Sequence, residues 1–479
     1  MITIGEITRS VKEEARSKDF KVQRLDNGQQ QAIIYFFESL CDTALSRERI
    51  SEPFAKSTSR EAFSRVLQSE LLCEEIREVS TMSVKLLKGY AIVFFNDRLW
   101  ALFAADVKVN QAGEATVEAT IQGPDSGLSE DTQTNINLIR NRYPSSHLIV
   151  EECCAGRISQ TKVAILYDST RVNTEVLQDI QKKIKAVEAD IVQDVGQLEA
   201  LITPMKYRLF PVMLITERPD RIALNLAQGK VIVLMQGTPF AIIAPVVFYD
   251  FMSAVDDVYH SFWVTRALVI LRYLALVITI MLPACYIAVV SYNPEIFRVQ
   301  LAVSIAGSRA TVPYPSFVEV LIMLFIIETL IEASIRLPNN IGQTATTVGG
   351  LILGQAAHEA GLVSSIMIII TSAVAIVNFV IPVNAMSFAM RIVKYPLIIL
   401  AILFGITGII VGMFCITLYL ASITSFGQPY FRLYRSEYSP TTCGSLPVQV
   451  ELEAISRVVP YGNFGTIRAS FYSPVVGLL

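Results

Sequence analysis

The sequence predicts an α/β cytoplasmic region of two small domains, followed by an all-α polytopic membrane domain. The chain has 479 residues, of which 52% are hydrophobic and only 17% charged, and this is too apolar for a soluble protein of its size. After about residue 265 the apolar residues form windows long enough to span a bilayer. Before that point short apolar runs alternate with charged helical segments, which is typical of α/β domains.

The first α/β domain is expected at residues 30–122, after an N-terminal extension at residues 1–29. The segment REAFSRVLQSELLCEEIREV has helical spacing, and YAIVFFNDRLWALFAADVKV contains two β-rich runs joined by a turn at Asn96 and Asp97. The extension lacks the apolar core and cleavage site of a signal peptide. We therefore expect the region before the membrane domain to lie in the cytoplasm.

A polar, turn-rich connection that contains one helix is expected at residues 123–146. Because it lies between the two domains, neighbouring subunits of a homo-oligomer are expected to meet there. The candidate subunit-contact residues are Thr134, Asn135, Arg140 and Arg142.

The second α/β domain is expected at residues 147–250. KVAILYD and FPVMLITE read as strands, and NTEVLQDIQKKIKAVEA reads as a helix with Asn173 as its N-cap. RPDRIALNLAQG is a helix ending at Gly229, and KVIVLMQGTPFAIIAPV is a hairpin-like pair of strands. These segments predict a second sheet covered by helices.

Composition and motifs exclude several classes of function. The formal net charge is -3 and no block of Lys and Arg occurs, so no nucleic acid is expected as a partner. The seven cysteines contain no C-x-x-C pair, and the adjacent Cys153 and Cys154 are a poor disulfide. With three histidines, and without a phosphate loop, a G-x-S-x-G elbow or an H-E-x-x-H helix, we expect no enzyme, catalytic residue, cofactor or metal site.

The membrane domain is expected at residues 251–427, before a C-terminal tail at residues 428–479. Aromatic residues Tyr259, Phe262 and Trp263 suit the headgroup level at its start. The predicted spans are residues 271–292, 318–337, 363–383 and 396–420.

Glycines at close-packing spacing are expected at helix contacts, either within the chain or between subunits. They are Gly350, Gly354, Gly408 and Gly412.

The segment at residues 339–361 carries a polar stripe, interrupted at Leu351, if it is helical. We expect it to be re-entrant or interfacial and to line a cavity, because polar segments survive at membrane depth only there. An amphipathic helix that shields the cytoplasmic mouth is the alternative. The pore-lining candidates are Gln343, Thr347, Leu351, Gln355 and Glu359.

Three charged residues precede this segment at intervals of four. Arg336 is a candidate partner for an ion pair with Glu332 at the helix end. The other interpretation is that Glu328 and Glu332 attract cations to a water-filled path, because an unpaired carboxylate in hydrocarbon is costly. A channel, with Leu351 as a gate that dewets, fits this segment better than a transporter, which usually needs two broken helices.

Four segments resemble the A subunit of GerA-type spore germinant receptors. The resemblance covers most of residues 120–427 and stops near residue 430. The segments are EASIRLPNNIGQTATTVGGLILGQAAHEAGLVS, TERPDRIALNLAQGKVIVLMQGTPFAIIAP, FWVTRALVILRYLALVITIMLPACYIAVVSYNPE and GPDSGLSEDTQTNINLIRNR.

The resemblance implies a multi-pass protein of the spore inner membrane that acts with a transporter-like B subunit and a lipoprotein C subunit. It implies a homo-oligomer in membrane lipid that starts germination by releasing monovalent cations when a nutrient binds, mainly at the B subunit. A non-conducting scaffold that passes on the signal is the main alternative, and a secondary transporter is a more distant one.

Overall fold

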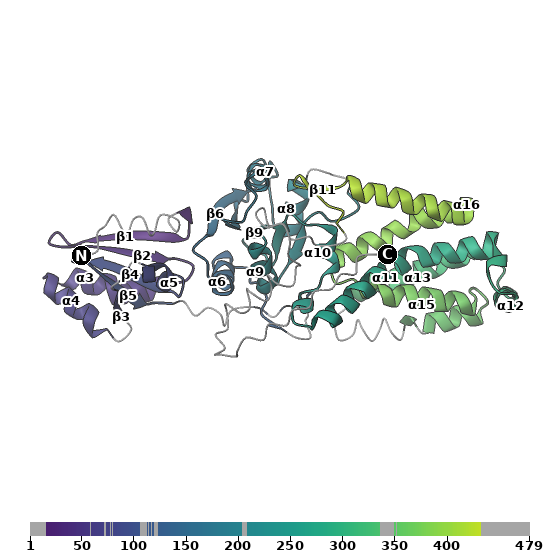
Figure 1. Ribbon diagram of the computed structural model, residues 1–479, viewed down its shortest axis with the longest axis horizontal. Coiled ribbons are helices and arrows are strands. Elements are labelled where there is room, and N and C mark those ends of the chain that lie inside the picture. Colours follow the sequence, from purple (N-terminus) through teal and green to yellow (C-terminus); the bar gives the residue numbers. More distant parts are fainter. Residues whose placement is uncertain are drawn as a thin grey trace, which may run out of the picture. The chain divides into compact units, whose positions relative to one another are not determined.

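The computed structural model describes residues 16–432 apart from residues 58, 71–72, 77, 79, 106–112, 114, 116, 119–122, 204–207, 336–348 and 351. Except for Arg432, all of these belong to one compact unit, residues 1–431. Two five-stranded sheets and a helical region follow one another along the chain, as the sequence predicts (Figure 1).

The first sheet is antiparallel, in the order β1-β2-β4-β5-β3. In β2, Ala32 and Ile34 point into one core cluster, whereas Tyr35 and Phe37 point into another on the opposite face. Both faces are therefore covered by helices. The elements are β1 (Phe20–Asp26), β2 (Gln31–Phe37), α2 (Thr43–Ser46), the π-helix η2 (Arg47–Ser51), α3 (Glu52–Lys56), α4 (Arg60–Ser69), β3 (Cys73–Ile76), α5 (Ser80–Leu86), β4 (Tyr90–Phe95) and β5 (Arg98–Phe103).

The β4–β5 hairpin is confirmed. Asn96 and Asp97 have φ of 51° and 57°, the left-handed conformation that a tight two-residue turn requires. Two expectations near it are wrong. The helix predicted from residue 60 ends at Ser69, because β3 pairs with β5. The extension at residues 1–29 contains β1, which pairs with β2 along its whole length.

The second sheet is also antiparallel, in the order β6-β7-β9-β10-β8. Helices α7 and α8 lie on one side of it, and α6 and α9 on the other (Figure 1). Asn173 caps α7 as predicted, by accepting a hydrogen bond from the Glu175 N–H. The elements are α6 (Thr132–Arg142), β6 (Leu148–Ala155), β7 (Thr161–Asp168), α7 (Thr174–Lys185), α8 (Val195–Ile202), β8 (Leu214–Thr216), α9 (Pro219–Ala227), β9 (Val231–Met235) and β10 (Ala241–Ala244).

Helix α6 is part of the second core rather than a linker. Ile136 and Ile139 are fully buried in the same cluster as β7 and β9. The subunit-contact prediction is wrong for Thr134, Asn135 and Arg140, because this chain itself buries them. Their polar groups bind Asp131, Ser129 and Asp19, so they are not on a surface that another subunit could reach. Arg142 is half-buried and donates to the Ser126 hydroxyl.

The helical region begins with two short helices, α10 and the 3₁₀ helix η4, and continues with long apolar helices. An unlabelled helix at residues 352–359 precedes α15. The other elements are α10 (Phe248–Met252), η4 (Val255–Val258), α11 (Phe262–Tyr292), η5 (Pro294–Ile296), α12 (Val299–Arg309), α13 (Ser316–Ile335), α15 (Ser365–Asn378), α16 (Asn384–Ser422), β11 (Thr424–Ser425) and β12 (Gln428–Pro429).

The helix bounds differ from the predicted spans. Helices α11 and α13 contain most of the first two spans, but α15 has 14 residues and is about 21 Å long, shorter than the roughly 30 Å hydrocarbon core. Among the described residues, only α11 and α16 are long and apolar enough to cross a membrane by length and composition.

Helix α16 is a hairpin of two arms, residues 384–404 and 406–422 (Figure 1). At Gly405 the backbone has φ 59° and ψ -137°, and a methyl group added at Gly408 would lie 2.1 Å from the Leu400 carbonyl oxygen. Gly412 is similarly close to Leu397. The single span predicted at residues 396–420 is therefore wrong. The apolar run hides the turn because no charged residue interrupts it.

Candidate functional site

The helical region runs out from the second sheet and returns to it. We call the end of the helical region next to the second sheet the near end and the opposite end the far end. At the near end, the Arg272 guanidinium on α11 forms an ion pair with Asp257 and donates to the Met252 carbonyl. At the far end, the Tyr292 hydroxyl of α11 donates to the Ile402 carbonyl, beside the Gly405 turn. The first arm of α16 thus ends at the far end, and the second arm comes back.

The segment after α16 closes this path on the second sheet. The Ser425 hydroxyl donates to the Val212 carbonyl at 2.7 Å and accepts from the Val246 N–H at 3.2 Å. Tyr430 is fully buried, and its carbonyl accepts from the Phe248 N–H. The chain therefore enters and leaves the helical region on the same side.

A buried carboxylate holds three helical segments together at the far end. Glu319, at the start of α13, is 0% exposed. It accepts hydrogen bonds from the Ser364 N–H at 2.6 Å and the Ser364 hydroxyl at 2.5 Å, just before α15. The Tyr286 hydroxyl on α11 donates to it at 3.4 Å, and Arg309 lies 3.5 Å away. This cluster was not predicted from the sequence, although an acidic residue at the start of an apolar run is a usable signal.

The polar stripe is described in part. Gln355 and Glu359 are both exposed on the helix at residues 352–359, and the Gln355 amide donates to the Glu359 carboxylate at 3.0 Å. This helix ends beside Gly361, whose φ is 68° and whose Cβ position would face the Thr311 carbonyl. Gln343, Thr347 and Leu351 lie outside the described residues, as does Arg336.

Glu328 has two cationic partners that are distant in the sequence. Its Oε2 accepts from the Arg391 Nε at 2.7 Å, and its Oε1 accepts from the Lys394 Nζ at 2.7 Å. Both cations come from the first arm of α16. The prediction that Glu328 attracts cations assumed that its carboxylate is unpaired. That assumption is wrong, because Arg391 and Lys394 pair with it. Glu332, one turn further on, is exposed.

The glycines near the stripe face apolar side chains of this chain. A methyl group at Gly350 would lie 3.8 Å from Leu330, and one at Gly354 would lie 4.0 Å from Ile368. These are ordinary contact distances, unlike those at Gly408 and Gly412.

A second buried charge network lies beside β8. The Arg218 guanidinium donates to both carboxylate oxygens of Asp220, at 3.0 and 2.7 Å, and to the Pro124 carbonyl at 3.2 Å. Burial alone would raise the pKa of Asp220, but the hydrogen bonds and charge of Arg218 outweigh it and hold that pKa below its usual value. These groups satisfy one another, which is typical of a structural network.

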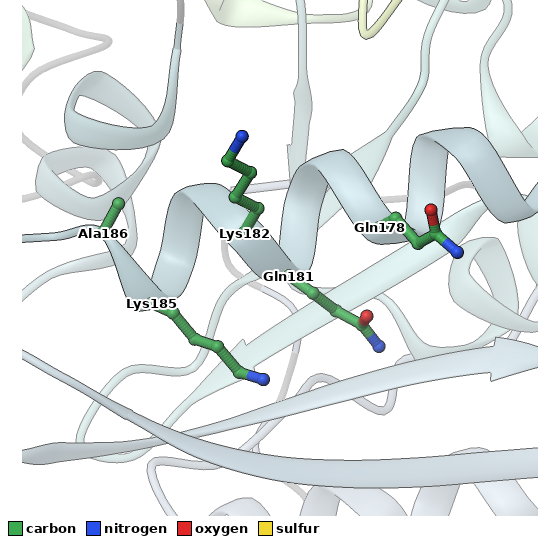
Figure 2. Close-up of a pocket in the computed structure, with 5 residues that line it drawn as sticks. All are labelled: Gln178, Gln181, Lys182, Lys185 and Ala186. Carbon is green, nitrogen blue, oxygen red and sulfur yellow. The ribbon is translucent and has the colours of Figure 1, made fainter.

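A surface hollow of about 440 Å³ runs along α7 (Figure 2). It is lined by Gln178, Gln181, Lys182, Lys185 and Ala186. The Gln181 amide donates to Glu151 on β6 at 2.6 Å, so part of its lining is already engaged. In the part of the chain that the structure describes, no group of three or more His, Cys, Asp or Glu could hold a metal ion.

The fold thus defines a protein of two parts. The first is an α/β region of two helix-covered antiparallel sheets, and the second is a helical region whose last segment returns to the second sheet. The chain belongs to the family described as "Bacillus/Clostridium GerA spore germination protein", which matches residues 6–442. The resemblance seen in the sequence is thus confirmed.

Individual relatives agree with this family. The chain is 32% identical over 435 residues to "Spore germination protein KA" of Bacillus subtilis (strain 168), covering 88% of this chain and 80% of that protein. It is 34% identical over 355 residues to "Uncharacterized membrane protein YfkQ" of the same organism, covering 74% of this chain and 69% of that protein. It is also similar to the crystal structure of the N-terminal domain of the A subunit of the Bacillus megaterium spore germinant receptor GerK3. That similarity has 21% identity, covers 52% of this chain and 96% of that chain, and has a TM-score of 0.38, too low to support an inference.

Proposed function

We propose that this chain is the A subunit of a nutrient-sensing germinant receptor and that several copies of it form a nutrient-gated cation channel. Its place is the inner membrane of the spore, where it works with a transporter-like B subunit and a lipoprotein C subunit. Membership of the spore germination family and similarity to a protein named as a membrane protein support this assignment.

One observation carries the channel proposal. Gln355 and Glu359 form an exposed polar pair on a helix that lies among apolar helices. A carboxylate facing hydrocarbon is costly, so this face needs water or a polar partner. A water-filled path between subunits would hydrate this face. The Glu359 carboxylate gives such a path a negative charge, which suits cations.

The path of the chain supports a multi-pass topology with both ends of the helical region in the cytoplasm. The first half of α11 contacts α10, which follows the second sheet, and the segment after the second arm of α16 is bound beside that sheet. The helix at residues 352–359 and α15 turn at Gly361, near the far end, and we propose that this pair lines the path rather than facing lipid.

A non-conducting scaffold is the second candidate. Arg272 ties α11 to α10 and η4, which follow the second sheet in the chain, and Ser425 ties the segment after α16 to Val212, just before β8. A movement of the helices could therefore pass to the α/β region. A scaffold needs these ties but not the charge of Glu359.

Spores that carry Glu359→Gln in place of the wild type test the proposal. The channel predicts slower nutrient-triggered release of monovalent cations at equal protein level. Glu295→Gln, which changes an exposed carboxylate in η5, just after α11, is the matched control and should leave release unchanged. Normal release from Glu359→Gln and Gln355→Leu spores would favour the scaffold.

A further inference from the structure

A charged pocket lies between α13 and the first arm of α16. It has a volume of about 240 Å³ and is lined by Glu328, Phe388, Arg391, Ile392 and Tyr395. The Lys394 side chain lies behind it, with 1% exposure, and pairs with Glu328. The pocket and its charges play no part in the channel path proposed above.

The pocket has an excess of positive charge. One carboxylate, Glu328, faces two cations, Arg391 and Lys394, so one positive charge is left over. The Arg391 guanidinium also lies 5.2 Å from the centre of the Phe388 ring, which holds it at the pocket mouth. Such a site favours an anion, and a phosphate oxygen is a suitable acceptor for a guanidinium.

An exposed apolar stripe continues from the pocket toward the far end. On α16 it consists of Phe388, Ile392, Ile399 and Leu403, which are 45%, 55%, 56% and 60% exposed. Their spacing of four, seven and four residues places them on one face of the helix. On α13, Phe325 is 72% exposed, one turn before Glu328. The chain thus presents a charged pocket at one end of an apolar surface.

The level of the pocket matches a membrane interface. Arg391 is seven residues, about 10 Å, from the start of α16 at Asn384. With the α/β region in the cytoplasm, this level lies toward the cytoplasmic leaflet. Basic pockets between helices at this level are typical binding sites for anionic lipid headgroups.

We propose that this pocket binds the phosphate of an anionic phospholipid, whose acyl chains lie along the stripe. The proposal rests on the membrane placement under the proposed function, but not on ion conduction. The stripe favours a lipid over free phosphate, because inorganic phosphate gains nothing from apolar contact. The excess charge favours an anionic lipid over a neutral one.

The test measures binding of phosphatidylglycerol, phosphatidylcholine and inorganic phosphate to the purified full chain in detergent, by native mass spectrometry and thermal shift. Phosphatidylglycerol should bind more tightly than phosphatidylcholine. Arg391→Gln removes the excess charge and should weaken phosphatidylglycerol binding about fivefold. Glu328→Gln adds an uncompensated charge and should strengthen it. Both variants break the same ion pair, so a purely structural role would shift both in the same direction.

Two further variants separate the sources of the phosphate. Ile392→Ser and Ile399→Ser should weaken lipid binding if the stripe holds acyl chains, whereas binding of inorganic phosphate alone with no effect of these variants would show a free-anion site. Arg298→Gln, an exposed cation near the far end, is the control and should change nothing.

Three results would overturn the proposal. One is equal binding of both lipids, and another is the same direction of change in Arg391→Gln and Glu328→Gln. The third is complete disulfide linkage of Ile392→Cys chains in the membrane, which would show that a second copy covers the stripe. Normal or absent cation flux would not affect any of these measurements, so the two proposals fail separately.

Discussion

Arg140 and Asp19 form a fully buried ion pair between residues 121 positions apart. The guanidinium donates to both carboxylate oxygens, at 2.6 and 2.8 Å, and lies 4.2 Å from the centre of the Phe37 ring. Asp19 directly precedes β1, and Arg140 lies on α6. The pair therefore fixes the edge of the first sheet to a helix of the second core.

Replacing Arg140 with Met should destabilise the first sheet strongly, by about 3–5 kcal/mol, because it leaves a buried carboxylate without its cation. Trp100, 4% exposed on β5, reports on this sheet, and Trp263→Phe removes the other tryptophan. The measurement is a urea titration of Trp100 fluorescence in that background. Lys21→Met, which removes the exposed Lys21–Glu38 pair, should change the midpoint little. Equal effects of the two variants would contradict this role of Arg140.

The same pair predicts a sensitivity to acid. Burial alone would raise the pKa of Asp19, but the charge of Arg140 and hydrogen bonds from Arg140, Ser17 and Ser39 hold it below its ordinary value of 3.8. A lowered folded-state pKa means that the stabilisation is present above pH 3.8 and is lost as the pH falls through the folded-state pKa. Urea midpoints measured downward from pH 5 should therefore fall more steeply for the wild type than for Asp19→Asn. Parallel curves would show that another group causes the acid sensitivity.

The α/β elements could be predicted where local signals are strong. Asn173 is a cap residue before an amphipathic helix, and Asn96-Asp97 is a turn between two apolar runs. The short strand β3, by contrast, reads as the end of a helix, because only its pairing with β5 makes it a strand. The extent of the first sheet was missed for the same reason, since the exposed positions of β1 are polar apart from Val22 and the strand depends on β2.

The hairpin in α16 depends on Gly405. Alanine at φ 59° and ψ -137° is strained by about 1–3 kcal/mol, and its methyl group would also lie 3.2 Å from the Tyr292 ring. Gly405→Ala should lower the thermal midpoint of the full chain in detergent. Gly307→Ala is the control, since a methyl group there meets nothing within 4 Å. If Gly405→Ala were as stable as Gly307→Ala, the turn would not lie at Gly405.

The adjacent cysteines on β6 should react at different rates. Burial raises the pKa of the Cys153 thiol to about 11, and Cys154 and Glu151 add to the effect, whereas Cys154 is exposed. Two units above the ordinary 9.0 mean roughly 100-fold less thiolate at pH 8. Iodoacetamide should therefore label position 154 in Cys153→Ser chains much faster than position 153 in Cys154→Ser chains, as measured by mass spectrometry. Equal rates would mean that β6 opens readily at this edge.

The candidate site could be predicted only in part. The spacing of Gln355 and Glu359 on one helical face was visible in the sequence, and the structure shows them in contact. The partners of Glu328 were not, because Arg391 and Lys394 are more than 60 positions away and become neighbours only when α16 folds back on α13. Distant charge pairs of this kind leave no local pattern.

The most direct test of the account is cation flux through the receptor reconstituted in liposomes, with this chain and its proposed B and C subunits. Nutrient should open a flux that Glu359→Gln reduces and Glu359→Lys abolishes, while Glu295→Gln conducts like the wild type. A complex that assembles but conducts nothing, or one in which all Glu359 variants conduct equally at matched incorporation, would contradict the channel and leave the chain as a scaffold.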